Sequence, residues 1–386
     1  MKKHKKKILA FSVGRSDFDR YFPILDKLRD IRNIDLKIAL SSIHQSSVFG
    51  KTINEVKKKK FNIIKNDTIK KNINFSEFFL PNEIIFLIKS IKKFKPDLII
   101  ALGDRYEMLA APCAALTFNI PVIHIYGGAV TEGAIDDLIR HSITKMSSYH
   151  LVATERYKDR LIQLGEEKWR IKNIGVPELM YLKKRKILSI KNINKLLKIN
   201  ISNETLLVNF HPVSTETNKT KIYILNLLSA IKKSKMQAIF TYPNADKTNE
   251  IIINEIKKFI NDANNNKYIF IKNAGAELYS NLLRNCSAMI GNSSSGIVEA
   301  ATFSLPAINI GNRQKGKVMP KNVIQTNYNK TNIFNSIIKS SKSFYKKGLK
   351  KFINPYENRI TSKKIANIIA NIKINDKLKV KKFQDL

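Results

Sequence analysis

Short apolar runs alternate with longer amphipathic stretches along the chain, and this alternation constrains the fold more than any other feature. Apolar runs of about four to eight residues fit buried strands, whereas apolar residues at every third or fourth position indicate helices. Strands that alternate with helices form parallel sheets. In the first half we expect strands at Lys7–Val13, Ile34–Leu40, Asp97–Ala101, Pro121–Ile125 and Tyr149–Thr154, and helices at Tyr21–Asp30, Asn82–Phe94, Tyr106–Phe118 and Ile135–Met146.

The same alternation restarts after a polar segment rich in lysine and asparagine near residues 183–203. A chain of 386 residues is also long for a single core. We therefore predict an α/β protein of two Rossmann-like domains with a cleft between them, at residues 1–182 and 200–355. A final helix at Ser362–Ile374 and a charged tail, expected to fray after Asn375, complete residues 356–386. The second set of strands is Thr205–Phe210, Gln237–Tyr242, Tyr268–Lys272, Ala288–Gly291 and Pro306–Ile310, with helices at Lys221–Lys232, Asn249–Asn261, Ala276–Asn285 and Gly296–Phe303.

Within the stretch 120–145, residues 124–141 gather ionisable side chains of several kinds beside glycines. The stretch has the pattern of a strand, a glycine-containing loop and a helix, and ligands of open α/β sheets bind where strands end. Carboxylates at the start of the helix suit acid–base chemistry, although they also complement the positive end of the helix dipole. A histidine here is as easily structural as catalytic. The ionisable residues are His124, Tyr126, Glu132, Asp136, Asp137, Arg140 and His141.

Two other strand ends of the first half carry charges. Gly14-Arg-Ser-Asp17 lacks the G-x-G-x-x-G spacing of dinucleotide sites. Arg15 could bind phosphate or carboxylate there, or the segment could be a turn in which Asp17 caps the next helix. In Gly103-Asp-Arg105, Asp104 suits a general base and Arg105 a phosphate contact. Two opposite charges at a strand end favour function over a capped turn in this second motif.

The strand ends of the second half favour phosphate binding. Gly291-Asn-Ser-Ser-Ser-Gly296 leads from a strand into a helix, where backbone N–H groups and the hydroxyls of Ser293 and Ser294 form an anion cradle. Glu299, one turn later, could accept both hydroxyls of a ribose. The segment is not a Walker loop, because the Gly-Lys-Ser/Thr ending is missing. His211, Asn244 and Arg313 follow other strands and are further binding candidates, although each also fits an ordinary turn.

Charge and composition narrow the function class. The net charge is +38, but the lysines are spread along the chain, whereas a nucleic-acid binder concentrates them. We expect an anionic small substrate and neither nucleic acid nor membrane as partner. Cys113 and Cys286 lack the spacing of a metal site or a disulfide, which favours a reducing cytoplasm. No metal and no other cofactor is expected.

Taken together, the motifs resemble the hydrolysing UDP-N-acetylglucosamine 2-epimerases, the group that supplies sialic-acid-type sugar synthesis. The resemblance runs from about residue 7 to about residue 345. It implies a fold of the glycosyltransferase-B type and a homodimer or homotetramer. It also implies elimination of UDP to a glycal, followed by hydration to the free 2-epimeric sugar. The motifs that carry it are Gly14–Asp17, Gly103–Arg105, His124–Gly128, Ile135–His141, His211-Pro212, Tyr242–Asp246, Gly291–Gly296 and Gly311–Gln314.

The resemblance also implies roles for single residues. Asp104 and Asp136 would be acid–base residues, with Arg105, Asp137 and His141 lining the sugar pocket. UDP would be bound by Arg15, His211, Ser293, Ser294, Glu299 and Arg313. Asp17 and Asn244 are further substrate-binding candidates.

Two positions depart from the family pattern. Many relatives carry Glu at the position of Tyr126, and a second Glu usually stands at the position of Ala129. Glu132 is the residue that could compensate. The Thr131-Glu-Gly133 variant resembles the branch that acts on 2,4-diacetamido-2,4,6-trideoxy sugars. That branch makes a diacetamido nucleotide sugar the expected substrate, with UDP-N-acetylglucosamine as the other possibility.

Two other functions are compatible with these motifs. A glycosyltransferase of the same fold would keep the nucleotide-binding residues but would need an acceptor. A non-catalytic nucleotide-sugar binding protein would bind UDP and release no product. The carboxylates Asp104 and Asp136 favour the epimerase.

Overall fold

The computed structural model describes residues 5–46, 51–67, 79–132, 135–202, 204–213, 215–243, 248–263, 266–349, 352–358 and 360–384. The chain divides into two compact units, and each is described by itself. The first unit consists of Met1–Ala129, Asp136–Glu178 and Asn358–Leu386. The second unit consists of Val130–Ile135 and Leu179–Glu357. The short segment Val130–Ile135 is therefore grouped with the second unit, although it follows a strand of the first.

A seven-stranded parallel sheet forms the centre of the first unit, in the order β3-β2-β1-β4-β5-β6-β7. Its strands are β1 (Lys6–Ser12), β2 (Ile34–Leu40), β3 (Ile63–Lys65), β4 (Leu98–Leu102), β5 (Val122–Ile125), β6 (Tyr149–Val152) and β7 (Ile171–Asn173). The helices are α1 (Arg15–Arg29), α2 (Ile53–Lys58), α3 (Phe79–Phe94), α4 (Ala110–Leu116), α5 (Asp136–Met146), α6 (Glu155–Gln163), α15 (Ser362–Asn371) and α16 (Asp376–Lys379). Short 3₁₀ turns lie at η1 (Ser42–Gln45), η2 (Tyr106–Leu109) and η3 (Lys168–Arg170).

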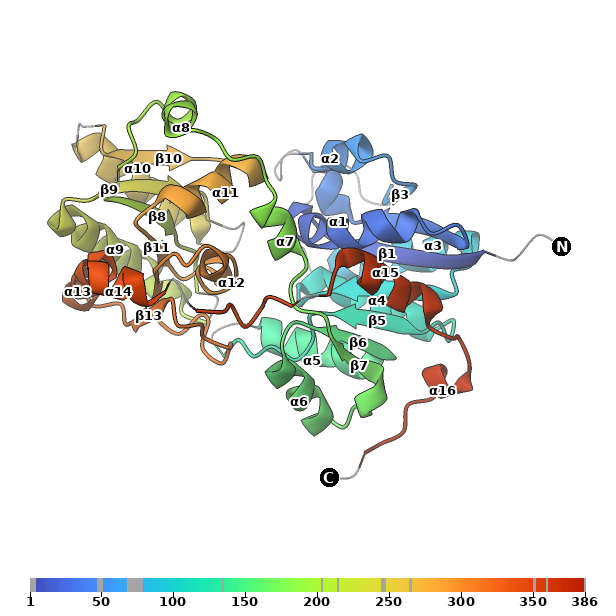
Figure 1. Cartoon of the computed structure of the whole chain (residues 1–386). Helices are drawn as coiled ribbons and strands as arrows, with labels where there is room; N and C mark the ends of the chain where they lie inside the picture. Colours follow the sequence, from blue (N-terminus) through green and yellow to red (C-terminus); the bar gives the residue numbers. More distant parts are fainter. Residues whose placement is uncertain are drawn as a thin grey trace. The chain divides into compact units, whose positions relative to one another are not determined.

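Both faces of this sheet are buried. Side chains of a strand point alternately to opposite faces, so Ile8 and Ala10 of β1 pack on the face covered by α1 and α15. Leu9 and Phe11 pack on the face covered by α3, α4 and α5. Helix α15 lies against α1 although the two are far apart in the sequence (Figure 1). The end of the chain thus completes the core of the first unit.

The second unit repeats the architecture with a six-stranded parallel sheet, in the order β10-β9-β8-β11-β12-β13. Its strands are β8 (Thr205–Asn209), β9 (Gln237–Thr241), β10 (Tyr268–Ile271), β11 (Ala288–Gly291), β12 (Ala307–Ile310) and β13 (Val323–Thr326). Helix α7 (Glu178–Lys183) leads into the unit. The other helices are η4 (Thr217–Lys219), α8 (Ile190–Leu197), α9 (Thr220–Ser234), α10 (Asn249–Ala263), α11 (Gly275–Asn285), α12 (Ser294–Thr302), α13 (Lys330–Ser341) and α14 (Ser343–Gly348). Apolar clusters lie on both faces of this sheet as well.

The prediction of a parallel, doubly wound α/β architecture is confirmed, with differences at the margins. The sequence pattern does not predict the short strands β3, β7 and β13, because edge strands of three or four residues show little periodicity. Helix α1 begins at Arg15, so Asp17 lies in its first turn and is not its N-cap. The expectation that the tail frays after Asn375 is also wrong, because the carbonyls of Lys377, Leu378 and Val380 accept hydrogen bonds from Arg170.

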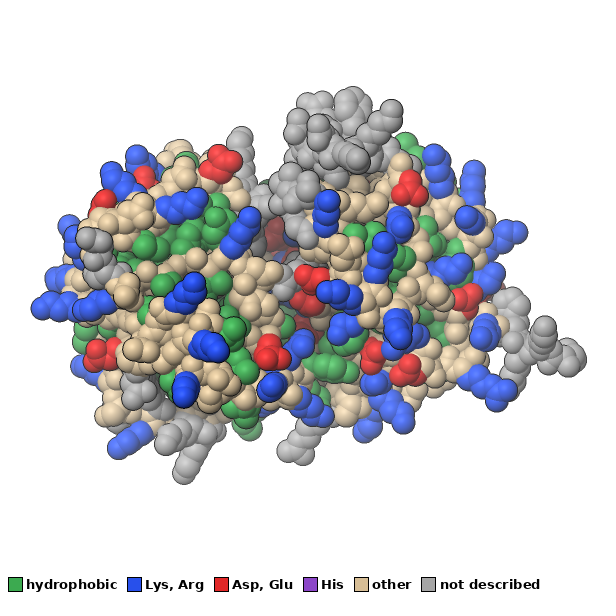
Figure 2. Space-filling view, turned by 90° about the horizontal axis from the view of Figure 1, so that it is seen from above, with side chains coloured by type: hydrophobic (Ala, Val, Ile, Leu, Met, Phe, Trp, Pro, Cys, Tyr) green, Lys and Arg blue, Asp and Glu red, His purple; other side chains and the backbone are tan. Residues whose placement is uncertain are grey.

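The surface agrees with a charge that is spread along the sequence. On the face seen in Figure 2, Lys and Arg side chains are scattered among polar and apolar groups and form no single patch. Among the described helices, none is long and apolar enough to cross a membrane.

Candidate active site

In the first unit, two of the predicted carboxylates meet on one buried arginine. Arg140 of α5 is 1% exposed. Its Nε donates to Asp104 Oδ2 at 3.0 Å, and its Nη2 bonds the same oxygen. Its Nη1 donates to Asp137 Oδ1 at 2.7 Å and to the carbonyl oxygen of Ala129 at 2.8 Å. The loop after β4 and the first turn of α5 are therefore joined through one guanidinium.

The electrostatics of Arg140 agree with these contacts. Burial by itself would lower the pKa of Arg140, but the charges of Asp104, Asp137 and Asp136, with the hydrogen bond to Asp104, raise it above its ordinary value. Arg140 belongs to the predicted group of ionisable residues, but no role for it is predicted from the sequence. Its spacing indicates a contact, because Arg140 follows Asp136 and Asp137 by one helical turn.

A buried histidine also connects the loop after β4 to helix α5. His124 of β5 contacts the carbonyl oxygen of Gly103 through Nε2 at 2.8 Å and Thr144 Oγ1 through Nδ1 at 3.0 Å. Burial lowers the pKa of His124 to about 3, so the ring is neutral. Because a carbonyl can only accept, Nε2 carries the proton and Nδ1 accepts from the Thr144 hydroxyl. His124 thus holds Gly103, the residue before Asp104, against helix α5.

The glycines after β5 are required by this packing. A Cβ on Gly127 would lie 2.9 Å from Thr144 Oγ1 and 3.0 Å from His124 Nδ1. Gly128 has a φ of +79°, and its Cβ would lie 2.4 Å from the carbonyl oxygen of Tyr157. These glycines therefore make room for neighbouring protein atoms that a side chain would displace.

Asp17 lies buried among charged groups at the start of α1. It is 6% exposed, and its Oδ2 has no hydrogen-bond partner among the described residues. Burial raises the pKa of Asp17 to about 6, opposed by the positive charges of Arg105 and Arg20 and assisted by Glu107 and Asp104. Arg105 is largely exposed, with its Nε 3.4 Å from Glu107 Oε2. Arg15 begins helix α1, and its side chain is outside what the structure describes.

His141 follows Asp137 on α5, as the spacing predicts. Its Nε2 lies 3.7 Å from Asp137 Oδ1, and its Nδ1 is buried with no hydrogen-bond partner among the described residues. Burial lowers the pKa of His141, opposed by Asp137 and assisted by Arg140 and Arg160. The ring is therefore neutral near pH 7, and its buried Nδ1 is unsatisfied among the described residues.

Tyr126, which departs from the family pattern, and Glu132, which could compensate for the loss at Ala129, each have a partner of their own. Glu132 belongs to the second unit, where its carboxylate lies 2.6 Å from Lys315 Nζ and is 48% exposed. Tyr126 has a φ of +71°, and its hydroxyl donates to Glu178 Oε2 at 2.5 Å. Burial and the neighbouring Glu178 raise the pKa of Tyr126 well above its ordinary value. Tyr126 therefore stays a neutral donor, and a compensating role for Glu132 stays a prediction.

In the second unit, a buried amide joins three strand-end loops. Asn292 Oδ1 accepts from the backbone N–H of His211 at 2.7 Å, and its Nδ2 donates to the His211 carbonyl at 2.8 Å. The carbonyl oxygen of Asn292 accepts from Gln314 Nε2 at 2.9 Å and from Arg313 Nη1 at 3.4 Å. The sequence analysis included Asn292 in the phosphate motif but did not select it. The sequence indicates a role for Asn292 only through its position inside the motif, between Gly291 and Gly296.

The predicted phosphate cradle begins helix α12. Ser293 is the N-cap, and its hydroxyl accepts from the backbone N–H of Ser295 at 3.3 Å. Gly291 has a φ of +146°, and a Cβ there would lie 1.9 Å from the carbonyl oxygen of Asn209, so only glycine fits. Tyr279 bonds Ser295 Oγ, and burial, with the charge of Glu299, raises the pKa of Tyr279. Ser294 and Glu299 lie on the first two turns of this helix.

His211 contributes an uncharged ring to this region. It is buried, and burial together with the positive charge of Arg313 lowers its pKa well below its ordinary value. At neutral pH it can donate or accept a hydrogen bond, but it brings no positive charge to a phosphate. Asn244, the remaining candidate, lies outside the described residues.

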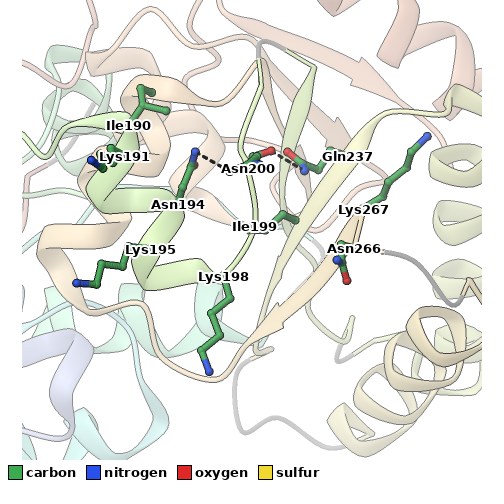
Figure 3. Close-up of a pocket in the computed structure, with 10 residues that line it drawn as sticks. All are labelled: Ile190, Lys191, Asn194, Lys195, Lys198, Ile199, Asn200, Gln237, Asn266 and Lys267. Carbon is green, nitrogen blue, oxygen red and sulfur yellow. Dashed lines mark hydrogen bonds between the residues drawn. The ribbon is translucent and has the colours of Figure 1, made fainter.

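A groove lies elsewhere on the second unit, and none of these candidate residues lines it. It has a volume of about 790 Å³ between α8 and the edge of the sheet (Figure 3). Asn194 Nδ2 donates to Asn200 Oδ1 at 3.2 Å, and Gln237 Nε2 donates to the Asn200 carbonyl at 2.9 Å, so these amides satisfy one another. Figure 3 shows the ammonium groups of Lys195, Lys198 and Lys267 pointing away from each other, and no catalytic group lines the groove.

Comparison with known proteins identifies the family. A family model described as UDP-N-acetylglucosamine 2-epimerase matches residues 26–370. The GDP/UDP-N,N'-diacetylbacillosamine 2-epimerase (hydrolyzing) of Campylobacter jejuni is 37% identical over 337 residues, which cover 84% of this chain and 85% of that protein. The chain belongs to the UDP-N-acetylglucosamine 2-epimerase family.

Two further members of the family agree with this assignment. The UDP-N,N'-diacetylbacillosamine 2-epimerase (hydrolyzing) of Legionella pneumophila is 30% identical over 97% of this chain and 98% of its own length. The crystal structure of the Neisseria meningitidis UDP-GlcNAc 2-epimerase has the same fold, with a TM-score of 0.79 and 19% identity over 94% of this chain and 98% of that one. The prediction of a hydrolysing 2-epimerase is confirmed. The two alternatives, a glycosyltransferase and a non-catalytic binding protein, are not supported by these relatives.

Proposed function

We propose that this 2-epimerase acts on a UDP-linked 2,4-diacetamido-2,4,6-trideoxyglucose and releases UDP and the free 2-epimeric, manno-configured sugar. The observation that carries the catalytic part is the pairing of Asp104 and Asp137 on buried Arg140 at the strand ends of the first unit. The substrate class rests on the Campylobacter and Legionella relatives, which are named as 2-epimerases of N,N'-diacetylbacillosamine nucleotides. UDP-N-acetylglucosamine is the other candidate substrate.

The proposed reaction consists of an elimination and a hydration. A carboxylate removes the proton at C2, the C1–O bond breaks with its electron pair leaving on UDP, and a C1–C2 double bond forms. Water then adds its oxygen to C1, while C2 receives a proton on the opposite face. We assign these proton transfers to Asp104 and Asp136, since carboxylates are common general acids and bases. Arg140 would hold Asp104 in place through both transfers.

The second unit would bind the nucleotide. The start of helix α12 offers backbone N–H groups and the hydroxyls of Ser293 and Ser294 to the diphosphate. Arg313, 3.4 Å from the Asn292 carbonyl, brings a positive charge to the same loops. Glu299 would accept the ribose hydroxyls. The neutral ring of His211 would donate a hydrogen bond and add no charge.

Product analysis without an acceptor tests this proposal. The protein is incubated with UDP- and GDP-linked diacetamido sugars and with UDP-N-acetylglucosamine, and the products are identified by NMR. We expect UDP and the free 2-epimer from the UDP-linked diacetamido sugar, with deuterium at C2 when the solvent is D₂O. Retention of protium at C2 would contradict the elimination mechanism, and preference for UDP-N-acetylglucosamine would contradict the substrate class.

The proposal also includes the cellular compartment and the oligomeric state of the protein. Both cysteines are free thiols, which suits a reducing cytoplasm. We expect a homodimer or a homotetramer, and light scattering coupled to size-exclusion chromatography measures the mass directly. A monomer at micromolar concentration would contradict this part of the proposal without affecting the chemistry.

A further inference from the structure

The C-terminal segment Asn375–Gln384 is bound to the first unit through its backbone. Arg170, which is 1% exposed, donates to the carbonyl oxygens of Lys377 at 2.7 Å, Leu378 at 2.8 Å and Val380 at 2.7 Å. It also donates to the carbonyl of Ser148 at 3.0 Å. One buried guanidinium therefore ties the segment to the loop between α5 and β6.

Lys381 of this segment binds the end of helix α5. Its ammonium donates to the carbonyl oxygens of Lys145 and Ser147, both at 2.9 Å, and to Thr144 at 3.3 Å. These carbonyls belong to the last turn of α5 and the residue after it, where a helix lacks partners of its own and where its dipole is negative. Lys381 therefore caps the end of α5 from a distant part of the chain, in addition to the local hydrogen bonds of Ser147.

The ammonium also completes a buried ionic network. Lys381 Nζ lies 2.7 Å from Glu166 Oε1, and the Glu166 side chain is fully buried. Lys145 lies 3.2 Å from the same oxygen, and His150 Nε2 lies 2.8 Å from Oε2. Burial would raise the pKa of Glu166, but His150 and Lys381 together lower it to about 2. Without Lys381, the buried carboxylate of Glu166 would lose the nearer of its two lysine partners, and a buried charge that is incompletely paired destabilises the folded protein.

Helix α5 connects this network to the acid–base residues. It has eleven residues, with Asp136 and Asp137 in the first turn and Arg140 one turn later. In its last turn, Thr144 presents its carbonyl to Lys381 and its hydroxyl to His124. His124 in turn holds the carbonyl of Gly103, next to Asp104. Three hydrogen bonds thus connect Lys381 through Thr144 and His124 to Gly103, the residue before Asp104.

We propose that Lys381 is a positioning residue for the epimerase reaction, and that segment 375–384 is an internal strap that sets the position of α5 and of Asp104. This inference rests on the proposed function for its catalytic readout. A strap of this kind affects turnover more than nucleotide binding, because proton transfer requires the acid–base groups within hydrogen-bond reach of the substrate. Most of the residues proposed to bind the nucleotide belong to the other unit.

The first test compares Lys381→Met with Lys379→Met in the full chain. Lys379 is an exposed lysine of the same segment, so it controls for loss of charge. We expect kcat of Lys381→Met to fall by about 10-fold or more, in line with the sensitivity of catalysis to small misplacements. The dissociation constant for UDP should be unchanged by calorimetry. Unchanged kcat, or an equal loss in Lys379→Met, would overturn the proposal.

The second test separates the strap from the rest of the chain. A variant that ends at Ile374 is assayed alone and with a synthetic peptide of residues 375–384. We expect saturable recovery of kcat with this peptide and with its Lys379→Met form, and no recovery with its Lys381→Met form. Recovery by the Lys381→Met peptide would overturn the role of the ammonium. If the shortened protein does not fold, the full-chain comparison decides.

The third measurement does not depend on activity. Hydrogen exchange of α5 amides is followed without substrate in wild type, Lys381→Met and Lys379→Met. We expect faster exchange over residues 140–147 only in Lys381→Met. Faster exchange with unchanged kcat would overturn the positioning role and leave a purely structural one. A wild type that turns over no nucleotide sugar would refute the proposed function, whereas unchanged exchange in Lys381→Met would refute the strap.

Discussion

The two units carry the same kind of sheet but organise their strand-end loops differently. In the first unit, charged side chains hold one another, with Arg140 between Asp104 and Asp137. In the second unit, the amides of Asn292 and Gln314 make the short contacts to backbone atoms, His211 is neutral, and the charged Arg313 adds one contact at 3.4 Å. Charged groups held in fixed positions suit proton transfer, whereas oriented amides and helix ends suit the binding of an anion. The comparison shows that two units of the same architecture can be suited to different tasks, proton transfer and anion binding, by the side chains in their strand-end loops.

The sharpest test of this division is the removal of single carboxylates from the first unit. Asp104→Asn and Asp136→Asn should each lower kcat by about 10²–10⁴-fold, because a positioned acid or base contributes that much. The affinity for UDP, measured by calorimetry, should stay nearly the same. Asp159→Asn, at an exposed position on α6, is the matched control and should be fully active. An equal loss of UDP affinity would break the division between the units.

Asp17 tests whether burial of charge in the first unit costs stability. Its pKa is about 6 in the folded protein and near 3.8 when unfolded, so the folded state holds the proton more tightly. Stability should therefore fall as pH rises from about 4 to 6 and stay lower above that range. Asp17→Asn removes this penalty, so at pH 8 the variant should exceed the wild type by up to about 3 kcal/mol in unfolding free energy.

Urea unfolding at several pH values measures this difference for Asp17→Asn. The gap to wild type should close towards pH 4, where the carboxyl is protonated in both states. Asp30→Asn, at the exposed end of the same helix, serves as control and should show no gap that opens with pH. A constant difference across the range would show that burial of Asp17 is not the cause.

In the second unit, the expected effects fall on binding. Glu299→Ala should weaken UDP binding by about 1–3 kcal/mol, the usual cost of polar groups left unpaired in a site. Asn292→Ala should do the same indirectly, since it frees the loop of His211. For both variants, kcat at saturating substrate should change less than the dissociation constant. Unchanged affinity of Glu299→Ala in calorimetry would remove that residue from the nucleotide site.

The smallest expected effect is that of a chelator. Arginine side chains and the start of α12 can neutralise a diphosphate without a metal ion. Activity should therefore be unchanged by EDTA in a steady-state assay. A loss that Mg²⁺ restores would mean that the nucleotide is held in a different way from the one proposed for the second unit.

Several elements show how far sequence patterns reach. Asp104 and Asp136 were selected because they follow predicted strands or begin a predicted helix, and the structure places them at those points. Arg140 was not given a role, because its partner Asp104 lies 36 residues away and the sequence holds no sign of that pairing. Lys381 is the extreme case, since its partner Thr144 is 237 residues away and the tail was expected to fray.

The sequence by itself determined the fold class, the two sheets and most residues at the strand ends, because hydrophobic period and strand-end position are local properties. Tertiary structure decided which charges pair, that His124 and His211 are neutral, and that the tail is bound. These outcomes depend on contacts between distant segments and on burial, which changes the free energy of a charge far more than any neighbour along the chain does.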